Sequence, residues 1–185
     1  MATADGSAPL DRAILGVLNP AGTRVGVGFL VAPDLALTCA HVVSSAIGEV
    51  NPETGAGAQV TLDLRLISVS GLGSVGGTVS AVVEHWEPPG ADGGGDIAVL
   101  RLRDALPEGR PVTMVEAADV WGHSMRTFGF PNGREFGVWH AGRLLGRQAA
   151  GWIQAQLAEP TGYRIEQGFS GAPVWDDELG GVVGM

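Results

Sequence analysis

The chain is 185 residues long and carries 11 basic and 20 acidic side chains, which give it a formal charge of −9. This acidity argues against a nucleic-acid-binding domain, because phosphate backbones are held by clusters of basic side chains. It also indicates no preference for anionic membranes. Hydrophobic residues make up 45% of the chain, enough to fill a core, so we expect a soluble protein of one ordinary domain or of two small barrels.

Thirty glycines and eleven prolines interrupt short apolar runs throughout the sequence. Turn residues spaced in this way are typical of an all-β protein with many short strands. No repeat of fixed period is present, which excludes a solenoid.

Cys39 is the only cysteine, so no disulfide can form within one chain. The first seven residues have neither the basic nor the apolar region of a secretory signal peptide. No apolar run reaches the length of a membrane span. Because disulfides persist mainly in oxidising compartments, these features predict a cytoplasmic protein.

The first half of the chain reads as short strands after a polar start. We expect a flexible lead-in over residues 1–12. A strand over 35–38 would follow a turn at Pro33 and Asp34 and end just before His41. The predicted elements of this half are an apolar run over 13–18, strands over 24–31, 35–38, 59–66 and 78–84, a helical turn over 42–47, a loop around His85 and Trp86, and a strand opened by Asp96.

Residues 104–111 carry charges and two prolines, and they are the predicted linker between two half-domains. The segments predicted as strands after this linker are 112–115, 124–130, 136–145, 152–157, 173–175 and 180–185. We therefore expect a first half at 13–108 and a second half at 109–185.

Three short motifs contain a histidine, an aspartate and a serine, in that order along the chain. The motifs are Thr38-Cys39-Ala40-His41, the segment from Asp96 to Leu102, and the segment from Gly168 to Pro173. This order differs from that of subtilisins, which is Asp, His, Ser, and from that of α/β-hydrolases, which is Ser, acid, His. The hydrolase motif Gly-x-Ser-x-Gly would also need a glycine at Ala172.

Each motif alone has an ordinary explanation. A Gly-x-Ser-Gly segment is a common turn, a histidine after a strand is often packed or exposed, and an aspartate that opens a strand is often a turn residue. Together they supply the groups of a nucleophilic acyl transfer, with Ser170 as nucleophile, His41 as proton acceptor and Asp96 as the carboxylate that orients the imidazole. Cys39, which precedes this histidine by two residues, is expected to be a buried small hydrophobe rather than a nucleophile.

These motifs resemble those of trypsin/chymotrypsin-like serine peptidases, in the bacterial, intracellular or HtrA-like branch rather than the animal zymogen type. Thr38 to Val43 is similar to the family's Thr-Ala-Ala-His segment, Asp96 to Leu102 to its Asp-Ile-Ala-Leu-Leu strand, and Gly168 to Pro173 to its Gly-Asp-Ser-Gly-Gly-Pro loop. The resemblance implies an all-β fold of two six-stranded antiparallel β-barrels with the active site in the cleft between them. It also implies an oxyanion hole made by the N–H groups of Gly168 and Ser170.

The chain departs from this family's pattern in three places. Phe169 replaces the aspartate that pairs with a newly exposed N-terminus in animal trypsins, so activation by proteolytic release of that terminus is not expected. Ala172 replaces a glycine, which is a small change. The chain stops at Met185, before the family's substrate-pairing segment, last strand and closing helix, and we expect an incomplete second barrel in a fragment, a processed chain or a fold that closes differently.

The resemblance also places Arg164, six residues before Ser170, at the floor of the primary substrate pocket. A basic floor would favour acidic side chains at the P1 position of the substrate. The alternatives are an arginine that faces solvent and one that Glu166 neutralises.

The predicted function is that of a serine endopeptidase working through an acyl-enzyme, as the protease module of a larger bacterial signalling or defence protein. The alternative is a catalytically silent or conditionally active module of the same fold that binds or regulates, and an esterase with the same nucleophile is a third possibility.

Expected partners are a protein or peptide substrate and further domains of the same polypeptide or an activating protein, with no nucleic acid and no membrane. No cofactor or metal is expected, because His85, His123 and His140 lie far apart without cysteine partners.

Overall fold

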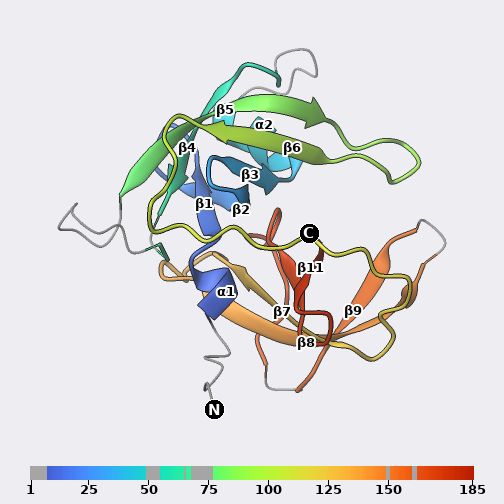
Figure 1. The fold of residues 1–185 in the computed structure, drawn as a ribbon. Coiled ribbons are helices and arrows are strands. Elements are labelled where there is room, and N and C mark those ends of the chain that lie inside the picture. The colour runs from blue at the N-terminus through green and yellow to red at the C-terminus, as the bar shows by residue number, and fades with distance from the viewer. Residues whose placement is uncertain (1–7, 49–54, 65, 68–76, 149–150, 160–161) are drawn as a thin grey trace.

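The computed structural model describes residues 8–48, 55–64, 66–67, 77–148, 151–159 and 162–185. It contains two β units, a closed barrel and a five-stranded sheet, drawn one above the other in Figure 1. The prediction of an all-β fold with two units is confirmed.

The first unit is a closed barrel whose strands follow the order β1-β2-β3-β6-β5-β4, with all neighbouring strands antiparallel. Alternate residues of each strand point inward. Large apolar side chains such as Phe29, Leu62 and Leu100 are therefore fully buried in its core. The strands are β1 (Ile14–Leu18), β2 (Arg24–Ala32), β3 (Leu35–Thr38), β4 (Gln59–Asp63), β5 (Thr78–Glu87) and β6 (Ile97–Leu102).

The chain enters the barrel through a short helical turn. α1 spans Ala8–Asp11, and Leu10 is only 1% exposed. Arg12, directly after α1, forms an ion pair with Glu108. The last part of the segment predicted as a flexible lead-in, 1–12, is therefore ordered, because burial of an apolar side chain anchors it to the core. Residues 1–7 of that segment lie outside the described residues.

The histidine motif leads directly into a helix. α2 spans Ala40–Ile47 and ends at Gly48, whose φ of 73° is left-handed. Its buried side chains pack toward β1, β2, β4 and β6, whereas His41 lies on the exposed side of its first turn. The helical turn predicted over 42–47 is confirmed, and it begins two residues earlier. Neither helix in the described part of the chain has the length and apolar character needed to cross a membrane.

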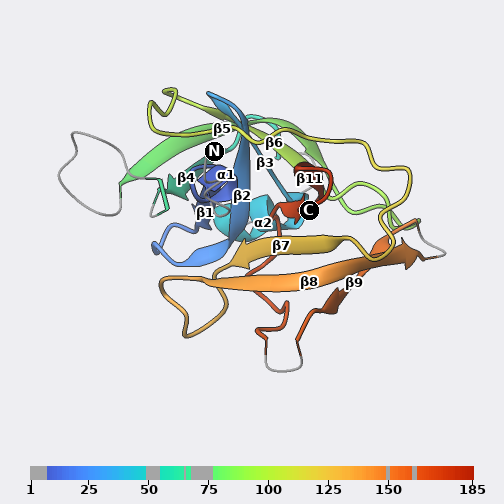
Figure 2. The same cartoon turned by 60° about the horizontal axis from the view of Figure 1, so that its bottom comes forward.

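The second unit is an antiparallel sheet of five strands in the order β11-β10-β7-β8-β9, beneath the barrel in Figure 2. The resemblance predicted a barrel of the six-stranded type that is incomplete here, and the open five-stranded sheet agrees with an incomplete barrel. In the described residues, the strand expected over 112–115 is replaced by one parallel bridge between Met114 and Val182. The strands are β7 (Ser124–Gly129), β8 (Val138–Arg147), β9 (Ile153–Leu157), β10 (Val174–Asp176) and β11 (Gly181–Gly184).

Two connecting segments have contacts that the sequence did not indicate. The expected linker, 104–111, lies between the last strand of the barrel and the first strand of the second unit and packs along the barrel, because Leu106 is buried and its N–H donates to the Pro33 carbonyl at 3.3 Å. Trp86 lies within β5 rather than in a loop, and its indole N–H donates to the Ala40 carbonyl at 3.2 Å. Trp86 thus ties β5 to the start of α2.

Arg24, the first residue of β2, joins the two units. Its Nε lies 2.7 Å from Asp63 Oδ2 in the barrel, and its Nη1 donates to the Glu135 carbonyl at 3.1 Å in the second unit. The guanidinium also stacks 4.7 Å from the centre of the Phe130 ring. Asp63 is only 5% exposed, and this pairing offsets the cost of burying its carboxylate.

Two buried threonines offer a test of the hydrogen bonding that supports this fold. Thr38 Oγ1 donates to the Val27 carbonyl at 2.6 Å, whereas Thr127 Oγ1 is buried without a partner among the described residues. Thr38→Val should lower the free energy of unfolding by about 1–3 kcal/mol, because a buried acceptor loses its donor. Thr127→Val removes an unpaired hydroxyl and should leave stability unchanged or raised. Urea denaturation of both variants measures the difference, and equal losses would contradict it.

A second prediction concerns the hairpin between β10 and β11. His123 Nδ1 lies 2.7 Å from Oδ2 of the fully buried Asp176, and His123 Nε2 lies 3.3 Å from Glu178 Oε2. The hydrogen bond with Asp176 raises the pKa of His123, and burial lowers it by less. The negative charges of Asp176, Glu178 and Asp119 raise the pKa further. Burial raises the pKa of Asp176. Hydrogen bonds from the Leu179 N–H, from His123 and from the Glu178 N–H outweigh this effect, so the pKa of Asp176 lies below its ordinary value.

Because the folded pKa of His123 is raised, its contribution to stability is fully present below the ordinary value of 6.5 and is lost as the pH rises through the folded value. The difference in melting temperature between the wild type and His123→Gln should therefore be largest at mildly acidic pH. It should shrink as the pH rises from about 6 to about 9. Thermal unfolding at constant ionic strength across this range tests the expectation, and a difference that does not change with pH would refute it.

Candidate active site

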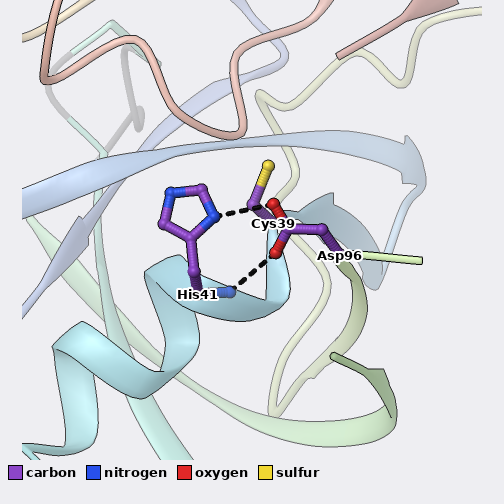
Figure 3. Close-up of side chains that lie close together, drawn as sticks. All are labelled: Cys39, His41 and Asp96. Carbon is purple, nitrogen blue, oxygen red and sulfur yellow. Dashed lines mark hydrogen bonds and ion pairs between the residues drawn. The ribbon is translucent and has the colours of Figure 1, made fainter. Parts of the chain in front are cut away.

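His41 and Asp96 are in direct contact (Figure 3). The ring atom Nδ1 of His41 lies 2.7 Å from Asp96 Oδ2, and the backbone N–H of His41 donates to Asp96 Oδ1 at 2.9 Å. Both carboxylate oxygens are thus engaged by one residue, which holds the imidazole in a defined orientation. The His41 side chain is 47% exposed and the Asp96 side chain 29%, so the free edge of the ring is open to solvent.

Asp96 reaches His41 because of an uncommon backbone turn before β6. Its φ of 62° lies in the left-handed region, which aspartate adopts more readily than most residues, and Gly95 before it has a φ of 75°. A Cβ at Gly95 would lie 2.4 Å from the Pro88 carbonyl oxygen, so only glycine fits there. A left-handed non-glycine residue costs on the order of 1–3 kcal/mol, which the hydrogen bonds to His41 offset.

The loop that carries Ser170 is attached to the barrel by its backbone. The N–H of Val27 in β2 donates to the Ser170 carbonyl at 2.8 Å. Gly171 follows with a φ of 79°, and a Cβ there would lie 2.1 Å from the Val27 carbonyl oxygen and 3.1 Å from the Cys39 nitrogen. A Cβ at Gly26 would also collide with Val42 and with the Ser170 carbonyl. Glycines on both sides therefore let the loop lie against the start of α2.

The Ser170 side chain is half-buried. Within the described residues its Oγ makes no hydrogen bond, so the contact with His41 that a triad requires is not formed in this conformation. Such contacts are often long in a free enzyme and tighten when substrate binds. The structure therefore brings His41 and Asp96 together directly and brings the backbone of Ser170 beside them.

The N–H groups of Gly168 and Ser170 donate no hydrogen bond within the part of the chain that the structure describes. Gly168 has a φ of 107°, and a Cβ there would lie 2.4 Å from the Phe130 carbonyl oxygen. Its own carbonyl accepts from the Phe130 N–H at 2.9 Å. The carbonyl of Gly168 is thus held by the second unit, while two neighbouring donors stay available for a ligand.

The other residues of this loop have distinct surroundings. Phe169 is 5% exposed, and its ring centre lies 6.2 Å from that of Tyr163. The Tyr163 hydroxyl donates to Glu166 Oε1 at 2.5 Å. Arg164 is exposed and has no hydrogen bond or ion pair with any other described residue, so Glu166 does not neutralise it by contact.

Cys39 lies beside the carboxylate of Asp96, at the position before α2 (Figure 3). Burial, followed by the negative charge of Asp96, raises the pKa of Cys39 to about 12, although the Gly171 N–H favours the thiolate. The thiol is therefore protonated at neutral pH, and a protonated thiol is a weak nucleophile. This finding agrees with the expectation that Cys39 is not the nucleophile, although its side chain is half-buried rather than buried.

His140 is a residue of the site region that the sequence did not reveal. Its side chain is 3% exposed, and Nδ1 lies 2.6 Å from the Tyr163 carbonyl oxygen. A carbonyl only accepts, so Nδ1 carries the hydrogen, and the buried Nε2 has no partner in the described part of the chain. His140 thereby supports the segment that leads to Ser170. His140 lies on the buried face of β8, and its hydrogen-bond partner lies 23 residues away in sequence, beyond the reach of a local pattern.

Comparisons with known proteins place these observations in a family context. Residues 26–185 match a family model described as a trypsin-like peptidase domain. No curated protein sequence gave a match.

Several solved structures are similar in fold. The serine endoprotease from Yersinia pestis is 16% identical with a TM-score of 0.64, and the match covers 100% of this chain but 57% of that protein. The structure of Deg5 is 18% identical with a TM-score of 0.64, over 98% of this chain and 81% of the other. The Rv3671c protease of M. tuberculosis, in an inactive form, is 21% identical with a TM-score of 0.60, over 98% and 80%. At these identities the likeness concerns the fold.

Proposed function

Because the chain belongs to the trypsin-like peptidase domain family, we propose that it is a serine endopeptidase with His41, Asp96 and Ser170 as its catalytic triad. The observation that carries this proposal is the 2.7 Å contact between His41 Nδ1 and Asp96 Oδ2, beside a loop that β2 binds through the Ser170 carbonyl. In this scheme residues 13–108 contribute the base and the carboxylate, and residues 109–185 contribute the nucleophile.

The geometry of the pair sets the direction of proton transfer. The carboxylate of Asp96 accepts, so His41 Nδ1 carries the hydrogen and Nε2 presents a lone pair. Nε2 takes the proton of the Ser170 hydroxyl as Oγ bonds to the substrate carbonyl carbon. It then gives that proton to the leaving amine as the peptide bond breaks. Water repeats the cycle on the acyl-enzyme and releases the acid product.

The negative charge that develops on the substrate oxygen needs fixed donors. The unpaired N–H groups of Gly168 and Ser170 are suited to this role. The bond from the Phe130 N–H to the Gly168 carbonyl, at 2.9 Å, fixes the peptide plane that lies between these two donors. Loss of one such donor costs about 100- to 1000-fold in turnover in related chemistry.

The primary pocket is proposed to prefer acidic side chains. Arg164 lies six residues before Ser170, is exposed, and has no ion pair within the described residues, so its charge is available to a substrate. Glu166, the nearest acidic residue in the loop, accepts from the Tyr163 hydroxyl instead. Charge complementarity then favours aspartate or glutamate at P1.

The setting of this module is part of the proposal. The chain spans 57% of the length of the Yersinia serine endoprotease that it resembles in fold. The proposed setting is a protease module of a larger bacterial signalling or defence protein. The lone half-buried Cys39 suits the reducing cytoplasm, since no disulfide is needed. The substrate would be a protein or peptide.

One observation favours a second candidate function. Ser170 Oγ has no hydrogen bond with His41 within the described residues, so the same fold could serve as a silent or conditionally active binding module. Such a module would need a partner or a further segment to complete the contact before turnover.

Labelling with a fluorophosphonate probe separates these candidates. The folded wild type should form one covalent adduct on Ser170, detected by intact mass and peptide mapping. Ser170→Ala should lose the adduct and reduce peptide cleavage by on the order of 10⁶-fold, because the nucleophile is gone. The exposed Ser80, on β5, provides a control, since Ser80→Ala should keep both. Cleavage that persists in Ser170→Ala would sink the proposed triad, and a folded wild type without an adduct would favour the binding module.

The P1 preference has its own test. On matched peptides with glutamate or glutamine at P1, Arg164→Ala should lower kcat/KM for the glutamate substrate by about tenfold and spare the glutamine substrate. Arg164→Glu should reverse the preference. Arg110, exposed on the barrel side, is the matched control, and Arg110→Ala should leave the ratio unchanged. An unchanged ratio in Arg164→Ala would remove this residue from the pocket.

A further inference from the structure

Three different metal-binding groups converge where α2 begins. The Sγ of Cys39, a ring nitrogen of His41 and a carboxylate oxygen of Asp96 all lie within 4.8 Å of one another. Nδ1 is the ring nitrogen that faces Asp96, at 2.7 Å from Oδ2. Cys39 and His41 come from the chain around the start of α2, and Asp96 from the turn before β6 (Figure 3). Among the described residues, no other group of three such side chains comes this close together.

The spacing suits a small tetrahedral cation. Zinc binds sulfur at about 2.3 Å and nitrogen or oxygen at about 2.0–2.2 Å, which puts tetrahedral ligand atoms about 3.3–3.7 Å apart. To reach this spacing, His41 Nδ1 and Asp96 Oδ2, now 2.7 Å apart, would have to separate, while Cys39 Sγ already lies within 4.8 Å of both groups. The His41 ring is 47% exposed, which leaves it room to turn.

The charges of the three groups balance those of a divalent cation. Binding forms a metal–sulfur bond as the Cys39 thiol gives its proton to solvent, so the site contributes a thiolate, a carboxylate and a neutral imidazole. The thiolate and the carboxylate together cancel the two positive charges, which matters in a half-buried place. A thiolate and an imidazole also select zinc-like ions over Mg²⁺ and Ca²⁺, which prefer oxygen ligands.

We propose that Cys39, His41 and Asp96 form a binding site for one thiophilic divalent cation of the Zn²⁺ or Cd²⁺ class, and that the bound cation inhibits the enzyme. The binding half stands on the donor geometry alone, and the inhibition half rests on the proposed function.

The inhibition follows from the ring atom that the cation would take. A metal on Nδ1 takes the place of the hydrogen that this atom shares with Asp96. The neutral imidazole keeps its one hydrogen by carrying it on Nε2 instead, through exchange with solvent, so Nε2 has no lone pair left to accept the proton of Ser170. The cation thus removes the general base without covering the nucleophile.

Binding is measured first, on the full chain and without substrate. Zn²⁺ competition against a chromogenic chelator should give one site per chain, and Cd²⁺ should produce the ultraviolet absorption of a cadmium–thiolate bond. Cys39→Ala should abolish that absorption and weaken Zn²⁺ binding by at least about tenfold, since even outer partners of a metal contribute about 10- to 100-fold. Mg²⁺ and Ca²⁺ in excess should not compete.

His85 supplies the matched control, because its Nε2 lies 3.9 Å from Glu87 on an exposed face. His85→Ala should retain the single site and its absorption. Equal zinc affinity in the wild type and a folded Cys39→Ala, or no cadmium–thiolate absorption in the wild type, would overturn the proposal.

Activity is measured second, as the ratio of cleavage rates with and without Zn²⁺. In the wild type and in His85→Ala, the rate with Zn²⁺ should fall below the rate without it, and a chelator should bring the two rates back to equality. The loss should need at least about tenfold more Zn²⁺ in Cys39→Ala. A chain that binds zinc through Cys39 but cleaves nothing would refute the proposed function and keep the site. A chain that cleaves peptides but binds no zinc would refute the cation site and leave the proposed function standing.

Discussion

The arrangement of this protein depends on one backbone hydrogen bond, from the N–H of Val27 in β2 to the carbonyl of Ser170, at 2.8 Å. It joins the barrel to the loop of the second unit and can form only where no side chain intervenes. Cβ atoms at Gly26 and Gly171 would collide with the Ser170 and Val27 carbonyls. Thr38 adds a donor to that same Val27 carbonyl. The two glycines are thus the condition for bringing two units, and the chemical groups on them, to one place.

A second constraint acts on the acid side of the site. Asp96 adopts a left-handed backbone, and its carboxylate holds both the N–H and the ring of His41. The same carboxylate lies beside Cys39 and helps to keep that thiol protonated. One half-buried negative charge therefore orients the His41 ring and keeps the neighbouring thiol protonated. It also completes a set of donors that suits a zinc-like cation, so catalysis and inhibition would compete for the same atoms.

The pattern of apolar and turn residues along short segments was enough to predict much of the fold. Where a prediction from this pattern was wrong, the cause is physical. Alternation and turn residues predicted the strands around His41 and Asp96, because both signals reside in a few consecutive residues. The ordered turn at Leu10 was missed, since one apolar residue in a polar segment shows no periodicity. The apolar run 112–115 predicts a regular strand, but only one bridge forms there, between Met114 and Val182. β5 runs beyond its predicted end because residues 85–87 pair with the start of β6, and the Trp86 indole also donates to the Ala40 carbonyl, 46 residues away in sequence.

The sequence by itself determined the chemical groups and their order: a histidine after a strand, an aspartate before one, and a serine between glycines. These are local properties, because each motif consists of a few consecutive residues. Only the tertiary structure decided which groups meet. It joined His41 to Asp96 across 55 positions, left Arg164 without a described partner, and gave His140 a role under the Ser170 loop. It also put the Cys39 thiol beside the pair. Such contacts depend on how strands far apart in the chain close into a barrel and a sheet, and no local pattern encodes that closure.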